Sequence, residues 1–187
     1  MKLKFITLTL PLFFLLASCG SNSSENSNAN RDTSENAPEQ IASPMNKISG
    51  EIDGVEVSMQ YSSPGVKKRK VWGELVPYGE VWRTGADEAT WIEFKSDVLV
   101  EGQKVPKGKY SLFTIPNQNE WTLILNKDWE QWGAFDYKQE DDILRVAIIP
   151  QINGDKQERL KFSIEDKIIF TWDKLIFSVN IASAKNS

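Results

Sequence analysis

The chain has 187 residues and a formal net charge of −4, with no histidine and one cysteine. The lack of histidine excludes Ser-His-Asp catalysis, Cys-His catalysis and His-ligated zinc. The acidic balance argues against nucleic acid as a partner. No glycine-rich loop of the P-loop or dinucleotide-binding type occurs. Carboxylate-based hydrolysis, an oxygen-ligand metal site and binding without chemistry remain open.

The first 18 residues have the pattern of a secretory signal peptide. Lys2 and Lys4 supply a basic start, and the apolar stretch that follows over residues 5–16 is shorter than the roughly 20 apolar residues that span a bilayer. The next residues, Leu16-Ala17-Ser18-Cys19, resemble the bacterial lipobox, in which the cysteine is diacylated and becomes the first residue of the mature protein.

We therefore expect the lipid on Cys19 to anchor the protein to a membrane of the cell envelope, most consistently the outer membrane, facing the periplasm or the surface. A plain secreted protein with a stray cysteine is the alternative. Removal of the two lysines of the signal changes the formal net charge from −4 to −6. With Cys19 used, no cysteine is left for a disulfide, so the domain depends on its core alone.

Residues 19–44 comprise the lipidated cysteine and a linker. From Gly20 to about Ser43 the chain is rich in Ser, Asn, Glu and Ala and has almost no apolar residue. Such a segment cannot bury enough apolar surface to offset the entropy of ordering it, so we predict a disordered tether. A folded domain is predicted over residues 45–184, followed by a tail over 185–187.

The domain is predicted to be all-β, because aromatic and β-branched residues recur at strand spacing without a sustained helical period. In chain order, strands are expected at residues 47–51, 55–61, 89–95, 98–100, 109–115, 121–126, 143–150, 160–165, 168–172 and 175–181. Turns are expected at Asp53-Gly54, Glu101-Gly102, Asn153-Gly154 and Asp173-Lys174. This pattern predicts one antiparallel β-sandwich, jelly-roll-like or Ig-like, with its last strands in a central position. One short helical turn is expected at 127–132.

The segment from Ser62 to Glu88 is the first candidate working surface. It lacks clean alternation and is rich in Gly and Pro, which indicates a long ordered loop, where function concentrates on β scaffolds. Its candidate ligand-binding residues are Trp72, Tyr78, Trp82, Arg83, Asp87 and Glu88. Aromatic rings beside charged groups suit a sugar or another polyol. The alternative is structural: the two tryptophans pack in the core, and the arginine pairs with a neighbouring carboxylate.

Trp129 and Trp132 form a second candidate cluster. They are three residues apart, so a helical turn would place them on one face, where they either stack on a ligand or cap the core. The acidic run over residues 140–142 lacks the alternating oxygen ligands of a calcium loop, so we expect a solvated turn there. No metal site and no cofactor are expected.

The chain resembles the DUF2911 family, a domain of unknown function. The resemblance is carried by short motifs along nearly the whole domain: Ser63-Pro64-Gly65-Val66, Val71-Trp72-Gly73, Leu75-Val76-Pro77-Tyr78-Gly79, Val81-Trp82-Arg83-Thr84-Gly85-Ala86, Tyr110-Ser111-Leu112-Phe113-Thr114-Ile115-Pro116 and Gln131-Trp132-Gly133. Asp87 departs from the family pattern, in which Asn is more usual. The resemblance implies one ordered domain in an exported protein and implies no activity.

Three functions follow from these observations. The first is a membrane-anchored module that binds a glycan or a similar envelope ligand. The second is a glycoside hydrolase that uses Glu88 with Glu74, Asp87 or Asp128 as its two carboxylates. The third is a structural role in which the domain docks an envelope protein. The sequence favours binding over catalysis, because no carboxylate pair is distinct from the many solvated acids.

Overall fold

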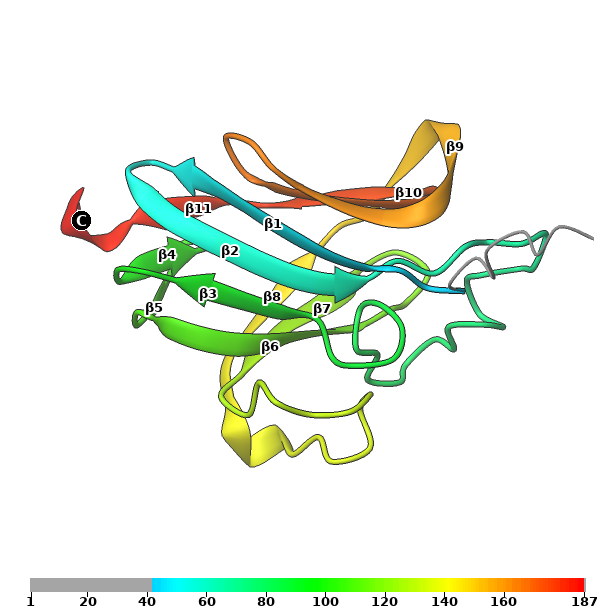
Figure 1. The fold of residues 1–187 in the computed structure, drawn as a ribbon, viewed down its shortest axis with the longest axis horizontal. Coiled ribbons are helices and arrows are strands. Elements are labelled where there is room, and N and C mark those ends of the chain that lie inside the picture. Colours follow the sequence, from blue (N-terminus) through cyan, green and yellow to red (C-terminus); the bar gives the residue numbers. More distant parts are fainter. Residues whose placement is uncertain (1–41, 187) are drawn as a thin grey trace, which may run out of the picture. The chain divides into compact units, whose positions relative to one another are not determined.

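The structure, a computed structural model, describes residues 42–186. The predictions for the signal peptide, Cys19 and most of the linker lie outside the described residues. Figure 1 shows an all-β fold of antiparallel sheets, as predicted. The main sheet has six strands in the order β1 (Met45–Ile52), β2 (Val55–Ser62), β3 (Trp91–Phe94), β6 (Gly108–Ile115), β7 (Trp121–Asn126) and β8 (Asp142–Ile148).

Two smaller sheets complete the sandwich. One pairs β9 (Gln151–Ile164) with β10 (Ile168–Val179), and the other has the order β11 (Ile181–Ser183), β4 (Val98–Val100) and β5 (Gln103–Val105). Strand β9 contacts β1, and β10 contacts β8. The β9–β10 hairpin therefore connects the two edge strands of the main sheet and covers its inner face (Figure 1).

Two of the predicted turns are confirmed. Asp53 and Gly54 have φ angles of 48° and 74°, and Glu101 and Gly102 have φ angles of 47° and 78°. Positive φ at both central residues is the geometry that matches the twist of a two-residue hairpin, which explains the preference for Asp-Gly. The first turn joins β1 to β2 in register, with Ile52 opposite Val55.

The predicted turns at Asn153-Gly154 and Asp173-Lys174 are wrong. Both pairs lie inside long strands, the first in β9 and the second in β10. Asp173 has a φ of 52°, and the register shifts on either side of it. The β9–β10 ladder is interrupted here, since Asp173 lies opposite Gln157 and Leu175 lies opposite Ile152. The turn-forming residues therefore make bulges within two long strands instead of ending them.

The last strands are not central, because β10 pairs only with β9 and forms a separate layer. The helical turn predicted at 127–132 is also wrong. Among the described residues, helical turns of the 3-10 type occur at Gln139–Asp141 and Ala184–Asn186.

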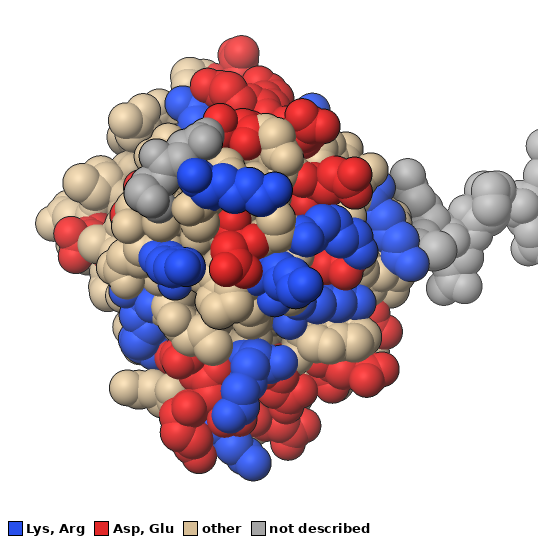
Figure 2. All heavy atoms as spheres, turned by 90° about the vertical axis from the view of Figure 1, so that its left-hand side faces the viewer, with Lys and Arg blue, Asp and Glu red and all other residues tan. Residues whose placement is uncertain are grey.

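Charged side chains cover the end of the domain that carries the β4–β5 turn and β11. Figure 2 faces this end and shows Lys and Arg intermixed with Asp and Glu. Lys95 pairs with Glu93 at 2.7 Å, with the two side chains 53% and 31% exposed. Such exposed pairs contribute less than about 1 kcal/mol each, so the stability of the fold comes from its interior.

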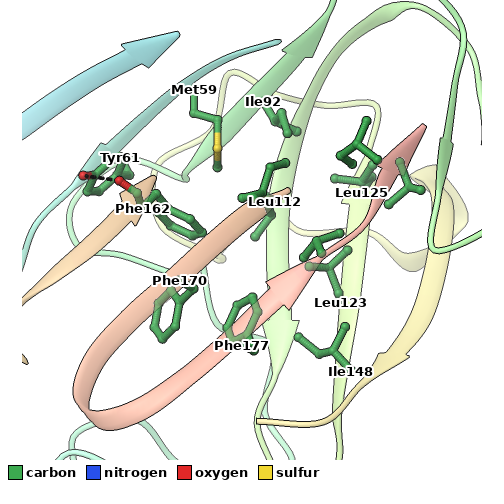
Figure 3. Close-up of a cluster of buried hydrophobic side chains, with 14 of the residues drawn as sticks. Met59, Tyr61, Ile92, Leu112, Leu123, Leu125, Ile148, Phe162, Phe170 and Phe177 are labelled. Atoms are coloured by element: carbon green, nitrogen blue, oxygen red, sulfur yellow. Dashed lines mark hydrogen bonds between the residues drawn. The ribbon is translucent and has the colours of Figure 1, made fainter. Parts of the chain in front are cut away.

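The core lies between the main sheet and the β9–β10 layer. Figure 3 shows Met59, Ile92, Leu112 and Leu123 of the main sheet facing Phe162, Phe170 and Phe177 of the other layer. The rings of Phe170 and Phe177 stack at 4.5 Å, and Tyr61 donates a hydrogen bond to the carbonyl of Phe162 at 3.4 Å. Alternate residues on each strand supply this core, as the period of two predicts.

A smaller apolar cluster lies on the outer face of the main sheet. Phe113 of β6 and Ile124 of β7 are fully buried there, and Ala89 packs on them with the partly buried Val81 and Tyr137. The connections before β3 and after β7 supply these covering residues. The outer face is therefore covered over β6 and β7 by two loops, and this cover forms the border of the candidate site.

Two buried tryptophans provide a matched test of the core. Trp121 and Trp172 are each 1% exposed, and Trp121 Nε1 donates to the carbonyl of Asn117 at 2.9 Å. Within the described residues, Trp172 Nε1 has no hydrogen-bond partner. Both Trp→Phe changes remove similar volume, but only Trp121→Phe breaks a hydrogen bond. We expect it to cost about 1–2 kcal/mol more in urea unfolding than Trp172→Phe. Equal losses would contradict this assignment.

Candidate functional site

The candidate site begins on the outer face of the main sheet, beside the loop cover. The register places Lys47 of β1 opposite Gln60 of β2, and Gln60 opposite Trp91 of β3. These side chains form the floor of a pocket of about 400 Å³. The full lining is Lys47, Gln60, Glu88, Ala89, Trp91, Lys109, Trp129, Glu130, Gln131 and Trp132. Its volume lies in the range of small-molecule sites.

The wall of the pocket is made by two loops that pair with each other. The amide of Ala89 donates to the carbonyl of Gln131 at 3.0 Å, and the amide of Gly133 donates to the carbonyl of Asp87 at 3.1 Å. Glu88 and Trp132 face each other in an isolated antiparallel bridge. Asp87 has a φ of 57°, a left-handed conformation that Asp and Asn adopt more readily than most residues. This conformation explains why either residue suits the position.

Side-chain hydrogen bonds fix the loop that carries Trp129 and Trp132, and they also explain why it is not helical. Ser111 donates to the carbonyl of Asp128 at 2.8 Å, and Asn126 Oδ1 accepts from the amide of Asp128 at 3.0 Å. Gln131 Nε2 also donates to the carbonyl of Asp128, so two side chains use a carbonyl that in a helix would accept from the amide of Trp132. The two tryptophans reach the same pocket from an irregular loop rather than from one helical face.

Lys109 lies between two of the pocket's indoles. Its Nζ is 3.7 Å from the ring centroid of Trp91 and 3.4 Å from that of Trp129. A cation over an indole face is attracted by the ring's electrons, so Lys109 fixes the relative position of the two rings. Desolvation lowers the pKa of Lys109, while the charges of Glu93 and Glu130 oppose this shift.

The pocket also presents hydrogen-bonding groups and one free aromatic surface. Gln60 Nε2 donates to Glu88 Oε2 at 3.4 Å, a long bond between exposed groups. Trp132 is 58% exposed at the rim. The site thus combines an open indole with carboxylates, an amide and ammonium groups. Chemically, these groups can contact an apolar face and several hydroxyl groups of one ligand.

The predicted ligand-binding residues fall into two groups in the structure: some belong to this pocket, and the others lie elsewhere. Glu88, Trp129 and Trp132 line this pocket, and the backbone of Asp87 belongs to its wall. Trp72 and Trp82 instead pack in the core. The Trp72 ring lies 4.8 Å from Trp121, and Trp82 stacks on Trp172 at 5.7 Å. These two rings therefore have the structural role that the sequence left open.

Tyr78 and Arg83 lie on other parts of the β2–β3 connection. Tyr78 is 38% exposed, and a Cβ added to Gly73 would meet its ring at 2.8 Å, so the ring packs on the glycine backbone. Arg83 is partly buried, and its pKa is lowered by desolvation, against the opposing effect of the Asp87 charge. Neither side chain lines the pocket of Trp132.

Seven lining residues were not among the predicted ones: Lys47, Gln60, Ala89, Trp91, Lys109, Glu130 and Gln131. Of these, Gln60, Trp91 and Lys109 each lie in a predicted strand, next to a residue that faces the core. The alternation of Trp91 and Glu93 against Ile92 and Phe94 contained the signal, because it placed a tryptophan on the outer, polar face. A large aromatic residue in the polar phase of a strand indicates either a covering loop or a ligand.

The carboxylates proposed for hydrolysis do not lie together in one pocket. Glu74 pairs with Lys70 at 3.0 Å on the surface, and neither Glu74 nor Asp128 lines the pocket of Glu88. The second acid in that pocket is Glu130. Over residues 42–186, no three acidic side chains gather in a way that could hold a metal ion. No helix in the same range has the length and apolar character to cross a membrane.

A buried carboxylate holds the end of the pocket loop. The Asp142 side chain is 5% exposed and accepts from Asn126 at 2.9 Å, Tyr137 at 2.6 Å and Arg145 at 2.7 Å. Burial raises the pKa of Tyr137 to about 12, and the hydrogen bond to Asp142 adds to this shift. The residues from 126 to 142 therefore close into a loop with fixed ends, between which Trp129 and Trp132 are displayed.

Comparison with known proteins gives one family. A family model described as "Protein of unknown function (DUF2911)" matches residues 43–181. Neither a curated protein nor a solved structure matches the chain. The matched range includes every residue that lines the pocket.

We predict that Asp142→Ala lowers the free energy of unfolding by about 2–4 kcal/mol, since it leaves three donors without their acceptor. The neighbouring Asp141 is a matched control, because it pairs at 2.9 Å with a Lys127 side chain that is 63% exposed. Asp141→Ala should cost less than about 1 kcal/mol. Urea unfolding measures both values. Hydrogen exchange should also show faster opening of residues 127–137 in Asp142→Ala alone, and protection equal to the native chain would contradict the anchoring role.

Proposed function

The chain belongs to the DUF2911 family, and we propose that its domain binds a glycan at the cell envelope, where a lipid on Cys19 holds the protein to a membrane. One observation carries the binding proposal. Of the seven tryptophans in the chain, three line one pocket, and Trp132 exposes 58% of its surface there. Trp72, Trp82, Trp121 and Trp172 pack in the core, whereas none of the three that line the pocket belongs to a buried cluster of the described residues.

A sugar ring fits the chemistry of the pocket. One face of a pyranose is apolar and stacks on an indole, while its hydroxyl groups both donate and accept hydrogen bonds. Glu88 and Glu130 supply acceptors, Lys109 supplies a donor, and Gln60 supplies both. Because two acids and two lysines line the pocket, its charges are balanced, which suits a neutral polyol better than a strong ion.

The Trp132 side chain provides the test of glycan binding. In a thermal-shift screen of the full-length protein against chito-, malto- and cello-oligosaccharides, we expect one class to raise the melting temperature. Trp132→Ala should weaken binding of that class by about tenfold or more, a loss of at least 1.4 kcal/mol. It should leave the melting temperature without glycan almost unchanged, because the indole is exposed.

Ile152→Ala is the matched control for this experiment. Ile152 is 82% exposed on β9 and does not line the pocket, so the variant removes an exposed apolar side chain elsewhere. Its glycan affinity should equal that of the native protein. Equal affinity in Trp132→Ala, or no shift with any oligosaccharide, would count against the proposal and favour a protein partner as the ligand.

The lipid anchor rests on the lipobox-like sequence and has its own test. We expect the native chain to incorporate a labelled palmitate analogue and to enter the detergent phase of a Triton X-114 extract. Cys19→Ala should do neither, because a diacylated cysteine supplies two acyl chains at about 0.8 kcal/mol per buried CH₂. A Cys19→Ala protein that still takes up the label and enters the detergent phase would contradict the assignment.

Glycoside hydrolysis is the second candidate, and one observation favours it. Glu88 and Glu130 line the same pocket, so a bound sugar would meet two carboxylates, the minimum set for a glycosidase. Release of reducing sugar by the native protein during the glycan screen would support this alternative, whereas reversible binding without product supports a binding module.

A further inference from the structure

Arg83 lines two hollows on the β2–β3 connection, which lies at the right of Figure 1. The smaller hollow, of about 200 Å³, is referred to here as the arginine hollow. Its lining is Ser43, Pro64, Arg69, Leu75, Val76, Trp82, Arg83, Gly85, Ala86 and Trp172. Two arginines therefore line one small space, and no acidic residue lines it.

The guanidinium of Arg83 has no counter-ion within hydrogen-bonding distance among the described residues. Its Nε is buried and has no hydrogen-bond partner there. The nearest influence of opposite charge comes from Asp87, an exposed residue that makes no ion pair with Arg83 in the described part of the chain. A partly buried guanidinium is normally paired, because desolvation of its charge is costly.

The other arginines of the domain each donate at least one hydrogen bond from the guanidinium group. Arg145 donates to Asp142 at 2.7 Å, and Arg159 donates to the carbonyl of Ser63 at 3.0 Å. Arg69 donates to the carbonyls of Gly65 at 2.6 Å and Val66 at 3.1 Å. Within residues 42–186, Arg83 is the arginine whose guanidinium donates no hydrogen bond that could offset its burial.

The backbone next to Arg83 is held in an unusual conformation. Thr84 has a φ of 51°, which is rare for a β-branched residue. Three hydrogen bonds hold it: its hydroxyl meets the carbonyl of Trp82 at 3.2 Å and the hydroxyl of Thr114 at 3.1 Å, and its carbonyl accepts from Thr90 at 3.0 Å. Such outliers persist where surrounding contacts fix them and concentrate at functional sites. The position of Arg83 is therefore imposed by the fold.

We propose that the arginine hollow binds a small organic carboxylate, whose oxygens pair with Arg83 and whose apolar body lies against Leu75, Val76 and Trp82. The planar guanidinium matches the two oxygens of a carboxylate in a bidentate pair. Apolar side chains make up most of the remaining wall, and Ser43 adds one hydroxyl. A phosphate group needs more hydrogen-bond donors than the arginine hollow offers, so it fits the hollow less well.

The lysine-bordered hollow at the opposite end does not have these features. Lys95, Lys104, Lys107 and Lys185 line it together with Asp97, which already accepts from the amide of Lys107 at 2.9 Å. Figure 2, which faces that end, shows acidic and basic side chains intermixed. An anion there would meet a carboxylate and solvated ammonium groups, whereas the arginine hollow offers an unpaired, partly desolvated guanidinium.

Intrinsic fluorescence of the full-length protein tests the proposal, since Trp82 and Trp172 line the hollow. The probe is benzoate, and its neutral isostere benzamide is the control ligand. We expect benzoate to change the fluorescence saturably and benzamide to bind at least about tenfold more weakly, because it lacks the charge. Binding of benzoate should weaken as salt rises.

The variants separate a binding role from a structural one. Arg83→Met should weaken benzoate binding by about tenfold or more. It should leave the melting temperature without ligand within about 2 °C of native or raise it, since it removes an unpaired charge. Arg145→Met is the matched control: it should keep the benzoate affinity and lower the melting temperature by about 4 °C, because it breaks an existing pair. Arg83→Lys should fold and bind with intermediate affinity, since it keeps the charge and loses the fork.

Several outcomes would overturn the proposal. They are equal binding of benzoate and benzamide, native affinity in both Arg83 variants, no saturable benzoate signal, or a response to inorganic phosphate alone. A large loss of stability in both Arg83→Met and Arg83→Lys would show that the guanidinium holds the loop instead. Trp132→Ala should not affect benzoate binding, because Trp132 does not line this hollow, so this test and the glycan test fail independently.

Discussion

The packing of Trp72 and Trp82 against Trp172 is the contact on which the other features depend. Trp72 lies 5.6 Å from Trp172 with its plane nearly perpendicular, and Trp82 lies parallel to Trp172 at 5.7 Å. These contacts insert the long β2–β3 connection into one end of the sandwich and join it to β10. A connection of nearly 30 residues with little strand structure needs such an anchor to adopt one conformation.

Once the β2–β3 connection is fixed, it contributes to two separate features, one on each of its sides. The amide of Trp82 donates to the carbonyl of Thr114 at 2.8 Å, which bridges the connection to β6. After this bridge, the chain reaches Glu88 over the outer face. There it pairs with the loop that carries Trp132. On the side toward β10, the same connection forms the arginine hollow, which Arg83 lines together with Trp172. One aromatic contact thus positions both the wall of the pocket of Trp132 and the lining of the arginine hollow.

The sequence predicted local features well and long-range ones poorly. Asp53-Gly54 specified a hairpin because the backbone of a two-residue turn selects these residues whatever surrounds them. Asn153-Gly154 carried the same signal, yet it lies inside β9, in an irregular stretch between the paired residues Ile152 and Gln157 rather than at the end of a hairpin. The helical turn predicted at 127–132 failed through a long-range contact, since Ser111 of β6 donates to the carbonyl of Asp128.

The candidate site was predicted only in part, because long-range contacts also bring its residues together. Glu88, Trp129 and Trp132 were identified from residue type. Strand alternation placed Trp91 on the outer face, but only the pairing of β3 with β6 brings it together with Lys109 in one pocket. Likewise, residue type alone could not tell Trp72 and Trp82, which pack among other rings, from tryptophans that meet solvent. Burial depends on which distant segments return to the same place, and a single sequence does not contain that information in its local pattern.

The distribution of tryptophans bears most directly on function. The four in the core fill volume and contact one another or Phe170, and a change to any of them acts on stability. The three around the pocket lie outside the buried clusters: the partly buried Trp91 and Trp129 are held by the charge of Lys109, and the exposed Trp132 is held through the bridge of its backbone to Glu88. The contacts with Lys109 preorganise the rings of Trp91 and Trp129, so the entropy of ordering these two side chains is already lost before a ligand arrives. The glycan binding that we propose would benefit from that arrangement.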